Sequence, residues 1–121
     1  MRVVIADFLD LGLVENMISL CRQEPWQIAV SADLVTDERL RVRLGVAVLF
    51  EELQTFCPEE LARAVPVLAG HCCHPQAWVR GEAATLLALT GLPEALSFLQ
   101  KLQNDPSPQV VELVRDLLHH A

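Results

Sequence analysis

The chain has 121 residues, 52% of them apolar, and a formal net charge of −7. This length suits one domain whose core needs no disulfide or metal to fold, and the longest apolar run, residues 46–50, is far shorter than the roughly 18 residues of a membrane span. Proteins that bind nucleic acids draw much of their affinity from basic side chains at phosphates, so the acidic balance argues against that class.

The start of the chain indicates neither a signal peptide nor a transit peptide, because the apolar residues after Arg2 end at Asp7. We therefore expect a cytoplasmic protein that does not enter membranes and whose cysteines stay reduced. The cysteines are Cys21, Cys57, Cys72 and Cys73. Residues 1–60 hold 11 acidic and 5 basic side chains, against 5 and 4 in residues 61–121, so the negative charge lies almost wholly in the first half.

Residues 1–12 contain a short apolar element that the pattern assigns equally well to a helix or to a strand, since Val3, Val4 and Ile5 are β-branched. As a strand it would be similar to the opening of a response-regulator domain, but no alternation of strands and helices follows. Helices are expected at residues 13–23 and 26–34.

A long helix is expected at residues 37–54, where nearly every residue from 44 to 50 is apolar. A helix that is apolar on all sides is normally packed on more than one side. Pro58 opens another helix, which runs to about residue 70 and should bend at Pro66, because proline lacks an N–H and clashes with the carbonyl four residues earlier.

The last three helices have clear limits. Apolar residues at helical spacing predict a helix at residues 77–90 that Gly91 ends. Pro93 begins the next, at residues 93–104. Asp105 is the expected cap of a final helix at residues 107–119.

The second half of the chain repeats itself with an offset of 31 residues. A fixed period of this size is typical of stacked supersecondary units, none of which can bury its apolar face alone. The matching positions are Leu61 and Leu92, Ala64 and Ala95, Leu68 and Leu99, His74-Pro75 and Asp105-Pro106, and Val79 and Val110.

The stretch from residue 64 to 96 resembles the HEAT repeat, in the short form named after phycobilisome lyases. The residues that carry the resemblance are Ala64-Val65-Pro66, Val79-Arg80, Ala83-Ala84, Leu86-Leu87 and Gly91, with Val42-Arg43 and Ala47 upstream and Asp105-Pro106 and Val110 downstream. The resemblance covers residues 36–121 and implies an all-α fold, a short right-handed α-solenoid of about eight helices. Residues 1–121 then form a single domain, with a degenerate capping unit (1–35), two repeats (36–73 and 74–104) and a half repeat (105–121).

The family pattern also assigns structural roles to charged residues. An arginine at the place of Arg80 often reaches an aspartate at the next turn, which here is Asp105, and Arg43 holds the matching place in the preceding repeat. We expect a ladder of ion pairs between repeats, the alternative being that Arg80 is simply solvated.

No catalytic or metal site is predicted. His71, Cys72, Cys73 and His74 are potential metal ligands, but consecutive residues cannot all point at one tetrahedral centre. The chain has no His-Glu dipeptide, which the iron-dependent hydroxylases of this fold require, and no phosphate-binding glycine loop. Trp26 and Trp78 follow turns and are expected to pack over helix starts, the alternative being that they are exposed contact residues for a partner.

The sequence therefore predicts a non-enzymatic scaffold without a cofactor, which binds a protein or peptide on the concave face lined by the second helices. The residues expected there are Arg63, Pro66, Glu94, Ser97 and Lys101. One alternative is an accessory, lyase-like subunit that holds a tetrapyrrole or other cofactor for transfer. Another is a homodimer formed through the C-terminal half repeat, whose apolar residues 110–118 lack a covering second helix.

Overall fold

The computed structural model describes residues 2–120, and within them the chain is all-α, with no strand. This confirms the all-α part of the predicted fold. The α-helices are α1 (Arg2–Asp10), α2 (Val14–Gln23), α3 (Gln27–Ala32), α4 (Leu40–Phe56), α5 (Val65–His71), α6 (Ala77–Thr90), α7 (Pro93–Lys101) and α8 (Pro108–His119). Short 3-10 helices lie between them at η1 (Asp33–Thr36), η2 (Pro58–Ala64) and η3 (Leu102–Asn104). Among these elements, none is long and apolar enough to cross a membrane.

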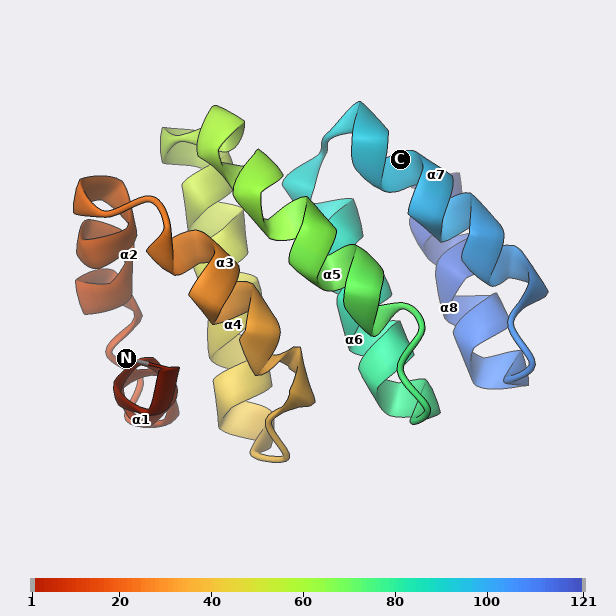
Figure 1. Cartoon of the computed structure of the whole chain (residues 1–121), viewed down its shortest axis with the longest axis horizontal. Coiled ribbons are helices and arrows are strands. Elements are labelled where there is room, and N and C mark those ends of the chain that lie inside the picture. The colour runs from red at the N-terminus through yellow and green to blue at the C-terminus, as the bar shows by residue number, and fades with distance from the viewer. Residues whose placement is uncertain (1, 121) are drawn as a thin grey trace.

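The helices form two layers (Figure 1). Helices α4, α6 and α8 pack side by side in one layer, which α2 extends beyond α4. Helices α3, α5 and α7 form the second layer across it, in contact with one another. Helix α1 lies against α2 and α4 at one end of the two layers, and α7 and α8 lie at the other end.

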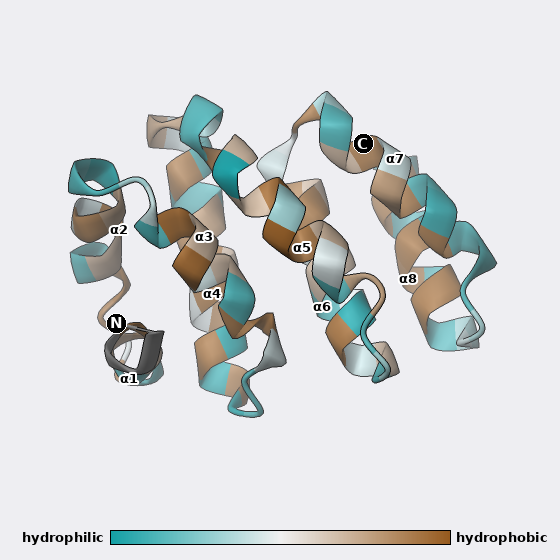
Figure 2. Ribbon diagram, in the orientation of Figure 1, coloured by the Kyte–Doolittle hydropathy of each residue, from teal (hydrophilic) through white to brown (hydrophobic). Residues whose placement is uncertain are grey.

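The core fills the space between the layers. Apolar residues occur along every helix, whereas the connecting turns are mostly polar (Figure 2). The fully buried large side chains include Phe50, Leu53, Leu61, Leu68, Leu87 and Leu99. Ala83 and Ala84 of α6 are also fully buried, and small residues of this kind let neighbouring helices approach closely.

Three helices begin with the same turn. The backbone N–H groups of Arg39, Gln76 and Ser107 each donate to the side chain two residues earlier. The acceptors are Asp37 at 2.9 Å, His74 at 3.0 Å and Asp105 at 2.9 Å. The three donor residues share an extended backbone immediately before α4, α6 and α8.

For residues 1–12 the sequence left helix and strand open, and the structure shows a helix, α1. Met1 lies outside the described residues. Strand propensity at Val3 to Ile5 is overridden because α1 packs on α2 and α4, with Ile5, Ala6 and Leu9 in the core. The strand hypothesis is wrong.

The predicted helix bent at Pro66 is also wrong, because the chain instead changes from the 3-10 helix η2 to α5 after Ala64. Pro66 therefore lies in the first turn of α5, where its missing N–H removes no helical hydrogen bond. Other limits move by a few residues: the helix expected at 37–54 is α4, and those expected at 26–34 and 93–104 each end in a 3-10 turn.

The cap of the last helix is Ser107 rather than Asp105. The Val110 N–H donates to Ser107 Oγ at 3.5 Å, while the Asp105 carboxylate is already occupied by the Ser107 N–H and by Arg80. Gly91 does end α6 as predicted, with a positive φ of 66° that a residue with a Cβ rarely adopts.

Candidate binding surfaces

Arg80 and Asp105 form a bidentate ion pair between α6 and the turn before α8. Arg80 Nε and Nη2 donate to the two carboxylate oxygens at 2.8 and 3.0 Å, and Nη1 donates to the carbonyls of His74 and Pro75 at 2.8 and 3.1 Å. Burial raises the pKa of Asp105, but the hydrogen bonds from Arg80 and Ser107 and the charge of Arg80 outweigh it, so the pKa lies below its usual value. The structure thus brings together the pair expected from the sequence and leaves Arg80 little exposed to solvent.

Arg43 of α4 makes the same kind of backbone contacts as Arg80 of α6. Its Nη1 donates to the carbonyls of Asp37 and Glu38 at 2.8 and 2.9 Å. Its guanidinium then reaches α6, where it lies 4.7 Å from the centre of the Trp78 ring and its Nε lies 3.5 Å from Glu82. Aromatic and carboxylate contacts therefore replace the aspartate that Arg80 finds.

The two tryptophans are more exposed than the interpretation of rings packed over helix starts predicted. Trp78 is 38% exposed even though Arg43 covers part of its ring, and Trp26 is 51% exposed. Trp78 also lines a groove of about 520 Å³ between α6 and α8, together with Gly81 and Leu113.

The residues predicted for the second-helix face lie on η2, α5 and α7, and all of them are exposed. They are Arg63, Pro66, Glu94, Ser97 and Lys101. Three of them already have partners within their own segment of chain. Arg63 Nε donates to Glu60 at 2.7 Å, Ser97 Oγ donates to the Glu94 carbonyl at 3.2 Å, and Lys101 Nζ lies 5.4 Å from the Phe98 ring centre.

The turn after α5 holds the four potential metal ligands apart. His71 Nε2 lies 2.8 Å from an Asp33 carboxylate oxygen, whereas His74 Nδ1 accepts the Gln76 N–H. Burial raises the pKa of the Cys72 thiol to about 11, while Cys73 is exposed. Within the described residues, no three His, Cys, Asp or Glu side chains are placed to share a metal ion.

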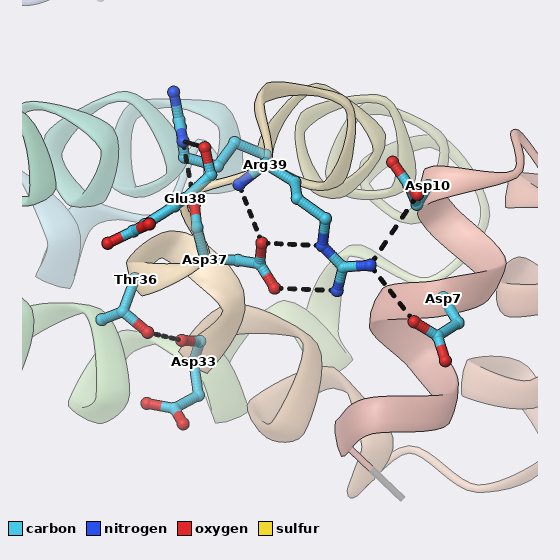
Figure 3. A network of polar contacts seen from close by, with 8 residues as sticks. Asp7, Asp10, Asp33, Thr36, Asp37, Glu38 and Arg39 are labelled. Atoms are coloured by element: carbon cyan, nitrogen blue, oxygen red, sulfur yellow. Dashed lines mark hydrogen bonds and ion pairs between the residues drawn. The ribbon is translucent and has the colours of Figure 1, made fainter.

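Arg39 joins α1 to the start of α4 (Figure 3). Its guanidinium donates to Asp37 at 3.1 Å and to Asp7 at 3.2 Å, and it lies 3.7 Å from Asp10. The hydrogen bonds to Asp37 and Asp7 raise the pKa of Arg39. The contacts of Arg39 with Asp7 and Asp10 were not predicted, because they join residues more than 25 positions apart that no motif relates.

The largest feature that the sequence analysis missed is an apolar stripe on the outer side of α4. Leu40, Leu44 and Val48 follow one another at intervals of four residues and are 57%, 56% and 44% exposed. We call these three residues the α4 stripe. The continuous apolar run at residues 44–50 was the signal, but it was interpreted as evidence that the helix packs on more than one side within the fold.

The α4 stripe borders a groove between α4 on one side and the α1–α2 turn and α2 on the other. One hollow of about 340 Å³ is lined by residues such as Leu11, Arg41 and Leu44, and a second of about 690 Å³ by residues such as Ile18, Glu52 and Phe56. Both are also lined by Gly12, Val14 and Val48, so they adjoin. We call them together the α2–α4 groove. Leu11, at its edge, is 72% exposed.

Each apolar residue of α8, the expected C-terminal half repeat, is less exposed than the residues of the α4 stripe. Val110 and Val114 of α8 are buried against α6 and α7, and Leu113, Leu117 and Leu118 are half-buried. Most of the exposed large apolar residues lie instead within residues 11–56, the exceptions being Trp78 and Leu96.

No known protein family, curated protein or solved structure matches the chain.

Proposed function

We propose that the chain is a short α-solenoid of HEAT-like repeats that binds another protein and has no catalytic activity of its own. The repeated helix starts support the repeats, because Asp37, His74 and Asp105 accept equivalent hydrogen bonds. Arg43 and Arg80 support them further. Each donates hydrogen bonds to two backbone carbonyls at the start of its own proposed repeat and contacts a carboxylate of the following one, Glu82 for Arg43 and Asp105 for Arg80.

The α4 stripe is the observation that carries the binding role. The opposite side of α4 contributes Val46, Phe50 and Leu53 to the core, so the stripe is a second apolar face that folding of this chain leaves uncovered. Contiguous exposed apolar surface marks interaction sites. Burial of the exposed half of each stripe residue under a partner would contribute roughly 1 kcal/mol a residue.

The second-helix face is the weaker candidate surface. Its basic residues are engaged locally, Arg63 with Glu60 and Lys101 with Phe98, and its large apolar residues are less exposed than Leu40 and Leu44. A partner bound there would have to displace or share these contacts, whereas the stripe offers exposed apolar side chains that form no hydrogen bond or ion pair that a partner would have to break.

Site-specific photo-cross-linking in the cells that make the protein tests the proposal. A photoreactive residue is placed at Leu44, at Ser97 on the second-helix face, or at the exposed Glu112 on α8 as a control. We expect a discrete adduct of defined mass from position 44 alone. An adduct from position 97 alone would move the site to the second-helix face, and the same result at all three positions would refute a specific binding surface.

A further inference from the structure

We infer that the α2–α4 groove binds an amphipathic helix of a partner protein, with apolar side chains on one face and basic side chains flanking them. This inference rests on the proposed function and adds the chemistry of the partner. It follows from the length of the groove, its apolar floor and the charges at its rim.

The shape of the groove suits a helix. Along α4 it runs from Arg41 to Phe56, which at 1.5 Å a residue is roughly 22 Å, or about four turns. Leu44 and Val48 line one wall, and Val14 and Ile18 the other. Two such apolar walls present ridges between which the leucine-like side chains of a third helix can pack, as in other helix-in-groove complexes.

The charges at the rim favour a basic partner. Asp10, Glu15 and Glu52 line the groove, against Arg41 as its basic residue. Asp10 lies 3.7 Å from Arg39, but Glu15 and Glu52 are exposed and form no ion pair with other described residues. These two carboxylates come from opposite walls, so they can flank a bound helix on both sides.

The net charge of the chain points the same way. Residues 1–60, which hold both walls, contain 11 acidic and 5 basic side chains. This field attracts a cationic segment and repels an anionic one, including a second copy of this chain, whose formal charge is also −7. A basic amphipathic helix is the occupant that matches both the walls and the rim.

Fluorescence anisotropy with synthetic peptides tests the inference on the full chain. The probe is a labelled leucine–lysine peptide of roughly 16 residues, with its leucines at helical spacing on one face. A second peptide replaces every lysine with glutamate, and a third keeps the lysines but spreads the leucines around the helix. We expect the first peptide to bind at least about tenfold more tightly than either of the others at low ionic strength.

A matched pair of charge reversals locates the site. Glu15→Lys with Glu52→Lys should weaken binding of the leucine–lysine peptide about tenfold, because two attractions at the rim become repulsions. Glu94→Lys with Glu112→Lys makes the same change in net charge at exposed sites on α7 and α8, and should weaken binding less than about threefold. Circular dichroism checks that each variant folds, and the corresponding glutamine variants replace any that does not.

Three results would overturn the inference. The first is equal binding of the lysine and glutamate peptides, and the second is an equal loss of binding in the two double variants. The third is a dimer, seen by sedimentation, that the substitution Leu44→Asp dissociates, because the groove would then hold a second copy of the chain. An adduct at position 44 without binding of the lysine peptide would leave the proposed function standing and refute only the basic helix. Binding of the lysine peptide without any adduct in cells would refute the proposed function and show only that the groove has affinity for a basic helix.

Discussion

The substitution Gly45→Ala tests how closely α1 packs on α4. Gly45 lies within α4, and a Cβ atom added there would lie 3.0 Å from Leu9 Cβ and 3.2 Å from Leu9 Cδ2. Carbon atoms pack best at about 3.5–4.0 Å, so the added methyl group is roughly 0.5 Å too close. Leu9 cannot simply rotate away, because its Cβ is fixed to the backbone of α1 and its side chain is buried.

The expected size of the effect follows from two opposing contributions. Alanine is preferred over glycine inside a helix by about 0.8–1 kcal/mol, whereas overpacking of a well-packed core costs about 1–3 kcal/mol. Since the contact involves an atom anchored to the α1 backbone, we expect a net loss of about 1 kcal/mol in the free energy of unfolding. For a chain of this length, that lowers the Tm by about 4 °C.

Gly70→Ala is the matched control. Gly70 lies in α5, and an added Cβ would meet no atom within 4 Å, so only the gain in helix preference applies. We expect this variant to be more stable by about 0.5 kcal/mol. Urea unfolding followed by circular dichroism measures both variants, and Gly45→Ala that stabilises the chain as Gly70→Ala does would refute the described packing of α1.

Three further predictions concern the turns and the second-helix face. Because the pKa of Asp105 is lowered, the contribution of Asp105 to stability is present above its unfolded pKa of about 4 and is lost as the pH falls through the lower folded pKa. Arg80→Gln should therefore lower the Tm at neutral pH and make the Tm fall less steeply with acid. An unchanged Tm for Arg80→Gln would show that the pair is merely solvated. Gly91→Ala should cost about 1 kcal/mol in urea unfolding, because its φ is positive. Arg63→Glu with Lys101→Glu should leave both folding and the position-44 adduct unchanged, and loss of that adduct would assign binding to the second-helix face.

Local sequence signals predicted the limits of helices well where a residue acts on the backbone at its own position. Gly91 and Pro93 limit α6 and α7 because a positive φ and a missing N–H act on the chain at those positions. The prediction was wrong at Pro66, because a first turn tolerates proline as readily as a bend does. It was wrong at Asp105, because Arg80, 25 residues away, competes for the carboxylate that would have capped α8.

The proposed binding surface was harder to predict for a physical reason. The apolar run around Leu44 indicates that α4 is apolar on more than one side, but it does not indicate which elements cover each side. That depends on where α1 and α2 lie, and they leave Leu40, Leu44 and Val48 uncovered. Contacts that join distant residues, such as that of Arg39 with Asp7, carry no local signal either.

The most direct test of the binding role combines stability and cross-linking in a single variant, Leu44→Ser. Because Leu44 is 56% exposed, this change should alter the free energy of unfolding by no more than about 0.5 kcal/mol. The adduct formed by a photoreactive residue at position 48 should meanwhile fall by about fivefold, the equivalent of roughly 1 kcal/mol of lost apolar burial. An undiminished adduct, or a loss of stability above about 2 kcal/mol, would contradict the account, since the α4 stripe would then serve the fold rather than a partner.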